Sequence, residues 1–259
     1  MNASKPINWS GWLTFGGVLL LWEIASRVSL WMQSYIPPVS QILSSLMALV
    51  ITGDIAVHLL ISLGRFVAGY VIAAVMAVTL GVILGYLRLL HSFLHTVIEF
   101  LRPMPSVAII PVALLFLGIG DSMIIAVTVY ASLWPILVNT IEGVRYVDPL
   151  LIDTGRTFGL GRWQILRRII LPAASPFIVT GLRISLAIAL ILVTTAEMIA
   201  GSQGLGFFVL DEERSLRTAN MYAGVFVVAV LGYLLNRIFL AWESWAMKWR
   251  AGMRATEAI

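Results

Sequence analysis

The sequence predicts an all-α integral membrane protein with six transmembrane helices and a cytoplasmic helix–turn–helix. Of its 259 residues, 60% are apolar and 12% charged, against about half and a quarter in soluble proteins. Six segments are long and apolar enough to cross a hydrocarbon layer, which takes about 17 to 25 helical residues. A short stretch between two of them combines capping residues, glycines and charges. The chain has no Cys, which excludes disulfides and thiolate metal sites.

The six predicted spans share an almost complete lack of charged residues. They are Pro6–Trp22, Phe66–Leu87, Pro103–Ile119, Ser122–Ile141, Pro176–Ala196 and Thr218–Asn236. Only Pro176–Ala196 contains a charge, Arg183, which lies near one end and can extend its guanidinium to the membrane interface. Because the number of spans is even, both termini lie on one side of the membrane.

The distribution of basic residues predicts which side that is. If both termini are cytoplasmic, the inside segments hold Lys5, Arg88, Arg102, Arg145, Arg156, Arg162, Arg167, Arg168, Lys248, Arg250 and Arg254, and the outside segments hold Arg65, Arg214 and Arg217. Cytoplasmic loops of membrane proteins carry an excess of Lys and Arg. Eleven basic residues against three therefore predict cytoplasmic termini.

The second span carries small residues at four-residue intervals: Gly69, Ala73, Ala77, Gly81 and Gly85. In an α-helix these positions form one stripe, and small residues let a neighbouring helix approach closely in lipid. We expect another span to pack there.

The third span begins in a segment with Pro103, Pro105 and Pro111. Each Pro leaves a backbone carbonyl without its helical donor, which a membrane tolerates only where protein or a water-filled cavity satisfies it. The segment is therefore either an irregular helix beside a pathway or an ordinary kink buried among neighbours.

The stretch from Val147 to Pro172 predicts the helix–turn–helix. Asp148 can cap free N–H groups, and Pro149 fits the first helical position. Gly159 is placed to end this helix in a left-handed conformation. A second short helix then runs from Arg162 until Pro172 ends it.

The first of these short helices is amphipathic. Val147, Leu150, Leu151, Thr154 and Phe158 recur at three- and four-residue intervals on one face. Since neither a span nor a soluble domain requires such a face here, it indicates a partner's groove. The basic residues nearby could equally contact the anionic leaflet, as in any inside loop.

The stretch resembles the cytoplasmic loop of binding-protein-dependent ABC transporter permeases, whose pattern is Glu-Ala-Ala, three residues, Gly, nine residues, Ile, one residue, Leu-Pro. This chain reads DTGRTFGLGRWQILRRIILP. Asp153, Thr154 and Gly155 replace the first triplet, while Gly159 and the Ile169 to Pro172 segment match. The segments YIPPVSQIL, LRPMPSVAIIPVALLFLGIGDS, LPAASPFIVTGLRISL and AEMIAGSQGLGFFV resemble the nitrate, sulfonate and taurine subgroup.

The resemblance implies a single permease domain over residues 1–259, with core spans in about 59–243. The loop 147–172 would contain the coupling helix that enters a cleft of a cytoplasmic ATPase. The coupling residues would be Asp153, Thr154, Gly155, Phe158, Gly159, Arg162, Ile169, Leu171 and Pro172.

The implied partners are a second permease copy, an ATPase dimer, an extracytoplasmic substrate-binding protein and the lipid bilayer, without nucleic acid. The implied location is the bacterial cytoplasmic (inner) membrane. ATP would be used by the partner, with no cofactor bound by this chain. The substrate would be nitrate, a sulfonate such as taurine, bicarbonate or a similar small solute.

A membrane enzyme and a self-contained channel are the two other classes of function. A P-loop needs a lysine that reaches the nucleotide phosphates, but Lys5 and Lys248 are the only lysines and neither lies in such a loop, so the sequence contains no P-loop. His91, His95 and Glu99 share a helical face, yet the first and last are about 12 Å apart along the axis, too far to bind one metal ion. A self-contained channel would not require the docking loop.

The expected translocation pathway draws on polar groups within or beside spans. The candidates are Met104, Pro105, Ser106, Thr194, Thr195 and Glu197. For Glu197 there are two interpretations: it faces the outer mouth, or it caps and tethers the Gly-rich segment AGSQGLG that follows.

Overall fold

The computed structural model describes residues 9–28 and 35–248, and all regular secondary structure in these ranges is helical. The helices are α1 Trp9–Arg27, α3 Val39–Thr52, α4 Asp54–Tyr86, α5 Arg88–Leu101, η1 Ser106–Ile109, α6 Ile110–Leu117, α7 Asp121–Arg145, α8 Pro149–Thr157, α9 Arg162–Ile165, η2 Leu166–Ile170, α10 Leu171–Ala200, α11 Leu205–Arg214 and α12 Thr218–Ala246. The prediction of an all-helical membrane protein is confirmed.

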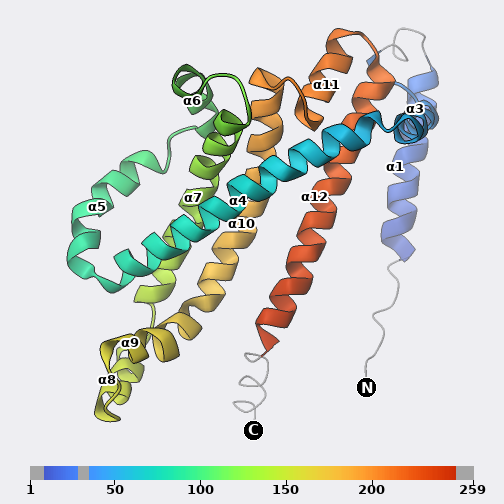
Figure 1. The fold of residues 1–259 in the computed structure, drawn as a ribbon. Coiled ribbons are helices and arrows are strands. Elements are labelled where there is room, and N and C mark those ends of the chain that lie inside the picture. Colours follow the sequence, from blue (N-terminus) through green and yellow to red (C-terminus); the bar gives the residue numbers. More distant parts are fainter. Residues whose placement is uncertain (1–8, 29–34, 249–259) are drawn as a thin grey trace.

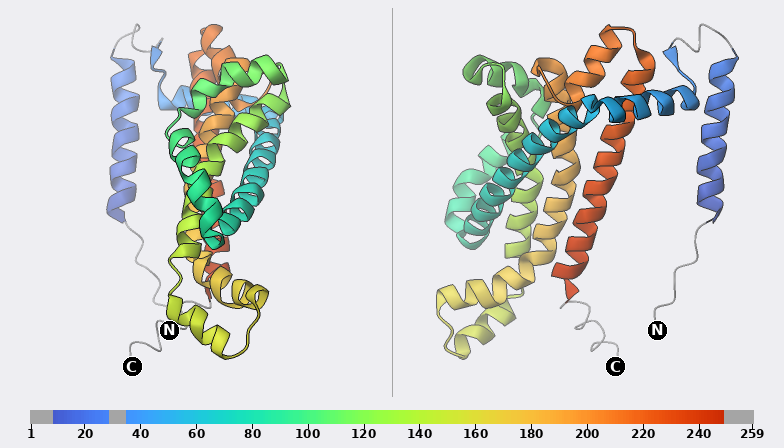
Figure 2. Two further views of the ribbon diagram at one scale, coloured as in Figure 1. Left: turned by 90° about the vertical axis from the view of Figure 1, so that its left-hand side faces the viewer. Right: turned by 45° about the vertical axis from the view of Figure 1, so that its right-hand side comes forward.

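The long helices form an elongated bundle in which α7 packs against both α4 and α10 (Figure 1). At one end α8 and α9 project as a hairpin, and at the other end α6 and α11 cap the bundle. We call these the inner and outer ends. Helix α1 stands beside the bundle and meets it near the outer end (Figure 2), where Trp22 packs edge-on against Tyr222 of α12. The described ends of α1 at Trp9 and of α12 at Ala246 point toward the inner end.

The predicted small-residue stripe on α4 is the contact with α7. Ala73 and Ala77 are fully buried. A Cβ atom added to Gly81 would lie 2.6 Å from the Cβ of Thr140, and one added to Gly85 would lie 2.6 Å from that of Val144. Because real Cβ atoms do not approach so closely, the two helices touch through the glycine backbone.

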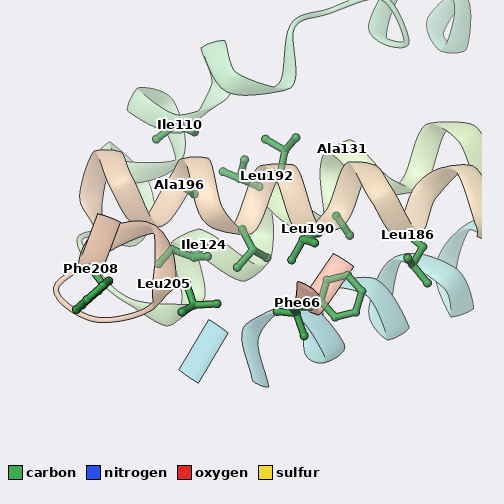
Figure 3. Close-up of a cluster of buried hydrophobic side chains, with 14 of the residues drawn as sticks. Phe66, Ile110, Ile124, Ala131, Leu186, Leu190, Leu192, Ala196, Leu205 and Phe208 are labelled. Carbon is green, nitrogen blue, oxygen red and sulfur yellow. The ribbon is translucent and has the colours of Figure 1, made fainter. Parts of the chain in front are cut away.

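The main hydrophobic core lies toward the outer end. It joins α3, α4, α6, α7, α10, α11 and α12 through one cluster of buried apolar side chains. Figure 3 shows part of this cluster, including Phe66 of α4, Leu190 of α10 and Leu205 of α11. The core thus fixes how α11 and the preceding loop sit on the long helices.

The described residues contain four helices long and apolar enough to cross a membrane, and a fifth span if a bent helix pair counts as one. The four contain the predicted spans at Phe66–Leu87, Ser122–Ile141, Pro176–Ala196 and Thr218–Asn236. Helix α1 has 19 residues and is not among them, and the predicted first span begins outside the described residues. The number six therefore stays a prediction.

The prediction that Pro103–Ile119 forms one span is wrong in its bounds. The chain is already helical from Arg88 and bends by 89° between α5 and the η1–α6 segment. Pro103 and Pro105 lack N–H groups, so the helix ends at Leu101 and restarts at Ser106. The Tyr130 hydroxyl of α7 donates to the freed Leu101 carbonyl at 3.0 Å, which satisfies it within protein.

The prediction that Pro172 ends the second short helix is also wrong, because the chain stays helical from Arg162 through Ala200, over 39 residues. Between α9 and α10 lies a π-helical turn, in which the Leu171 N–H donates to the Leu166 carbonyl five residues back. Pro172 then lies in the first turn of α10, where a missing N–H costs little. The π-helical turn, which is wider than an α-helical turn, thus allows the helix to continue through Pro172.

Candidate functional site

The inner hairpin, comprising α8, the turn at 158–161 and α9, forms as the sequence predicts. The Asp148 carboxylate accepts a hydrogen bond from the Leu150 N–H at 2.8 Å, which caps α8. Gly159 has φ +77°, and its N–H donates to the Arg156 carbonyl while that of Leu160 donates to Gly155. A left-handed glycine followed by this pair of bonds is the usual glycine end of a helix.

One side of the hairpin is anchored to the bundle. Val144, Val147, Ile165 and Ile170 are buried in a small cluster at the inner end. Gly155 is buried against it, and a Cβ added there would lie 2.6 Å from Cδ1 of Ile169. Gly155 is unfavourable for an isolated helix, but here it lets α8 lie close to the π-turn. The sequence pattern gave no indication of this contact.

The other side of the hairpin exposes large apolar side chains. Leu150 of α8 is 70% exposed and Phe158 is 81% exposed, with Leu151 and Trp163 also exposed. Leu150, Leu151, Thr154 and Phe158 share the face predicted from their spacing, whereas Val147, predicted on the same face, is buried in the cluster at the inner end. We call these four residues the outward face of α8. In an isolated chain this face is unpartnered, while the rest of the hairpin is held in place.

The remaining residues singled out in the loop lie around this face. Asp153 pairs with Arg156 at 2.9 Å, and the Thr154 hydroxyl donates to the Leu150 carbonyl at 2.7 Å. Arg162 and Pro172 are exposed, whereas Ile169 and Leu171 are half-buried. Ile169, Leu171 and Pro172 therefore belong to the base of the hairpin, and Asp153 and Phe158 to its tip.

A hollow of about 1180 Å³ lies between the hairpin and the inner ends of α4, α5 and α7. Its lining residues are Gly85, Tyr86, Arg88, Val144, Arg145, Val147, Pro149, Ile152, Asp153, Arg156, Leu160, Gly161, Arg162, Ile165 and Ile170. Four of them are arginines. The α8 residues among them lie on the face opposite the outward face.

At the outer end, four polar side chains from α4, α7 and α10 form a second group, which we call the outer polar cluster: Ser62, Arg65, Asp121 and Glu197. Arg65 is 7% exposed and Glu197 is fully buried. Arg65 Nη1 lies 2.8 Å from Glu197 Oε1, and Arg65 Nη2 lies 2.6 Å from Asp121 Oδ1. The Ser62 hydroxyl donates to the Glu197 carboxylate at 2.7 Å. Each buried charge thus has a partner.

The outer polar cluster also holds the Gly-rich loop before α11. Gly206 N–H donates to Glu197 Oε2 at 3.0 Å, and Leu205 N–H donates to the Ser62 hydroxyl at 2.7 Å. Gly204 has φ +112°, and a Cβ added there would meet the Glu197 carboxylate. Of the two interpretations of Glu197, the geometry matches the tether of this loop.

The remaining pathway candidates lie on two neighbouring segments. Met104 and Pro105 are exposed at the bend and Ser106 begins η1, which contacts α7 and α10. Thr194 and Thr195 are half-buried on α10, and the Thr194 hydroxyl donates to the Leu190 carbonyl.

Comparison with known proteins identifies the class to which this architecture belongs. The sequence profile of the family described as binding-protein-dependent transport system inner membrane component matches residues 77–246, more than half of the chain. The chain belongs to this family. The match covers the stretch from the inner half of α4 to the end of α12, so it includes the hairpin and, of the outer polar cluster, Asp121 and Glu197.

Several relatives of the permease are of similar length. A putative ABC transporter permease of Methanocaldococcus jannaschii is 34% identical over 204 residues, covering 78% of this chain and 76% of its own. The taurine transport permease TauC of Escherichia coli is 30% identical, covering 86% and 83%. The bicarbonate transport permease CmpB of Synechococcus elongatus is 32% identical, covering 72% and 68%.

Among solved structures, an inward-facing MetNI methionine ABC transporter contains a chain similar to the permease. The TM-score is 0.58 at 21% identity, covering 70% of this chain and 92% of that one. This likeness shows the fold alone. Family membership makes the permease a transport component and not an enzyme. In the described part of the chain, no group of three or more His, Asp or Glu side chains is placed to hold a metal ion.

The sequence did not identify Arg65 and Asp121 as members of a polar site. Arg65 was counted only among the basic residues of the outside segments, and Asp121 was not singled out. Two features pointed to them: a single Arg one residue before a long apolar run, and an acid directly at a helix start. What the sequence did not provide was the distance between the two helices that brings them together.

Proposed function

We propose that the permease forms, with a second copy of itself, the translocation pathway of an importer for a small nutrient. A separate ATPase dimer supplies the energy at the inner end, and an extracytoplasmic binding protein delivers the solute at the outer end. The relatives' names for taurine and bicarbonate support a small anionic or zwitterionic solute. We assign the whole chain, 1–259, to one such domain in the bacterial cytoplasmic membrane.

The observation that carries the proposal is the outward face of α8. Phe158 and Leu150 are mostly exposed at the tip of a hairpin whose opposite side is anchored by buried contacts. An amphipathic helix with one face left open is suited to a partner's groove. We propose that this partner is the ATPase and that α8 is the coupling helix.

The proposed coupling residues divide by role. Phe158 and Thr154 contact the ATPase, whereas Asp153, paired with Arg156, and the exposed Arg162 support the hairpin from the side of the hollow. Gly155 and Gly159 set the position and direction of α8. The segment of Ile169, Leu171 and Pro172 carries any movement of the hairpin into α10.

The orientation follows from the basic residues. Arg102 is no longer counted among the cytoplasmic basic residues, because its neighbour Leu101 contacts Tyr130, which lies midway along α7. Among the basic residues placed near either end of the described chain, seven lie toward the hairpin end, Arg88, Arg145, Arg156, Arg162, Arg167, Arg168 and Lys248, against four at the outer end, Arg27, Arg65, Arg214 and Arg217. The positive-inside rule then places the hairpin and both termini in the cytoplasm.

For the pathway we retain Met104, Pro105 and Ser106 at the bend, with Thr194 and Thr195 on α10. A break in a helix exposes backbone polar groups, which is tolerated beside a water-filled route. Glu197 is assigned to the fold of the outer loop, since its carboxylate is enclosed.

The test is co-purification of the tagged permease with its ATPase after Phe158→Asp, together with ATP-dependent uptake of labelled solute. A charge on the outward face should abolish both, because burying an unpaired carboxylate costs several kcal/mol. The matched control is Leu216→Asp, which puts the same charge on an equally exposed apolar side chain at the outer end; ATPase binding should persist. If Phe158→Asp binds the ATPase as the wild type does, the coupling assignment is wrong.

A further inference from the structure

We propose that the hollow between the hairpin and the inner ends of α4, α5 and α7 binds the phosphate headgroup of an anionic phospholipid from the inner leaflet. This inference concerns the face of α8 opposite the outward face, and so it goes beyond ATPase coupling. It is argued from the charge, the composition and the depth of the hollow.

The rim of the hollow is strongly cationic. Arg88, Arg145, Arg156 and Arg162 line it, and Asp153 is the one acid among its described lining residues. Asp153 is already paired with Arg156. Within the described ranges no carboxylate lies within salt-bridge distance of the other three arginines. An anion is therefore the complementary occupant, and guanidinium groups bind phosphate in a bidentate manner.

The floor of the hollow is apolar. Val144, Val147, Ile165 and Ile170 line it below the arginine rim. These side chains are only 3–7% exposed, so they close the base of the hollow and its open part is the arginine rim. A cationic opening over a closed base favours an anionic group, and the position of the hollow decides where that group comes from.

The hollow lies at the depth of the headgroups. It is bounded by the last residues of α4, Gly85 and Tyr86, and by Arg145 at the end of α7, two helices long and apolar enough to cross the membrane. Helix α5 starts at its rim and buries none of its residues, with Phe93 73% and Phe100 77% exposed. A lipid can therefore reach the hollow along any part of this apolar helix that the second permease copy leaves uncovered.

The competing occupant is an acidic segment of the ATPase. The geometry disfavours it, because the α8 residues of the hollow, Pro149, Ile152, Asp153 and Arg156, lie on the side opposite Leu150 and Phe158. A protein docked on the outward face approaches from the other side of the helix. The hollow instead lies between α8 and the membrane.

The experiment measures lipid retention by native mass spectrometry of the purified permease, with phosphatidylglycerol and phosphatidylcholine supplied equally. The wild type should retain phosphatidylglycerol in preference. The double variant Arg88→Gln/Arg145→Gln should bind it at least about tenfold more weakly, since each Arg near the surface contributes to anionic-lipid affinity. Neither residue belongs to the proposed ATPase contact, so the two proposals can fail separately.

The matched control is Arg167→Gln/Arg168→Gln, which removes the same charge from two exposed residues outside the hollow; retention should equal that of the wild type. Equal loss in both double variants would reduce the effect to general surface charge and overturn the site. Equal retention of phosphatidylcholine, or displacement of the lipid by excess inorganic phosphate, would also overturn it. So would expulsion of the lipid when the ATPase assembles with the permease.

Discussion

The two ends of the permease differ in whether their key side chains find interaction partners within the chain. At the outer end, Glu197 and Arg65 are buried but have partners within the same chain. At the inner end, Phe158 and Leu150 are apolar yet remain mostly exposed. A buried charge with its partners in place holds a fold together, whereas an exposed apolar face at the tip of an anchored hairpin is complete only with another molecule. Variants at the outer end should therefore change stability, and variants at the inner end should change association.

The largest expected effect is on stability, from Glu197→Ala. Removing one partner of a buried ion pair costs about 3–5 kcal/mol, and here it also frees the N–H of Gly206 and the hydroxyl of Ser62. We expect a melting temperature lower by about 10 °C in detergent. A melting temperature equal to that of the wild type would show that the outer polar cluster does not hold the loop.

Next in size is Gly206→Ala, because the added Cβ would meet the Thr194 carbonyl oxygen of α10. Backbone must shift to admit it, at about 1–3 kcal/mol. The matched inner variant, Gly161→Ala, has open space around it and φ −68°, and should cost about 1 kcal/mol or less. Thermal unfolding of both variants checks the contrast, which disappears if the two losses are equal.

A smaller effect on stability but a full loss of coupling is expected for Gly159→Val. The left-handed conformation of Gly159 strains a β-branched residue by about 1–2 kcal/mol, and relief of that strain redirects α8. Gly159→Asn is the control, since Asn adopts this conformation readily. We expect uptake to fail in the Val variant and to survive in the Asn variant. Equal uptake in both would mean that the direction of α8 is unimportant.

The smallest effect should come from Asp121→Asn. Its side chain is 69% exposed, so solvent screens its attraction to Arg65, and such exposed pairs contribute about 1 kcal/mol or less. Thermal unfolding should show a shift near the error of the measurement. A loss as large as that of Glu197→Ala would indicate that Asp121 stabilises the outer polar cluster as strongly as Glu197 does.

The inner end was largely predictable from the sequence because its structure is local. Asp148 caps a helix two residues away, and Gly159 closes the same helix through bonds to its own last turn. The four spans found in α4, α7, α10 and α12 are likewise local, since each is a continuous apolar run. The stripe from Gly69 to Gly85 predicted a close contact, although not that α7 makes it.

What the sequence did not reveal depends on distant contacts. Arg65 and Glu197 are 132 residues apart, and no pattern within either segment indicates the other. The continuation past Pro172 depends on a π-turn whose hydrogen bonding is not encoded by residue type. The bend at Pro103 was anticipated as irregularity, but the sequence did not show that Tyr130 of α7 donates to the Leu101 carbonyl there. Gly155 is unfavourable in an isolated helix, and nothing in the local sequence showed that Ile169 packs against it.

The unbroken helical path from Arg162 to Ala200 has a mechanical consequence. The path changes direction at the π-turn (Figure 1), so its straight part is α10, whose 30 residues extend about 45 Å at 1.5 Å per residue, with the hairpin at one end and Glu197 near the other. A tilt of about 5° about the inner end of α10 displaces its outer end by about 4 Å. That displacement exceeds the length of the bonds from Glu197 to Arg65 and Ser62. The outer ends of α4 and α7 must therefore travel with α10 as one body, or else these bonds must break.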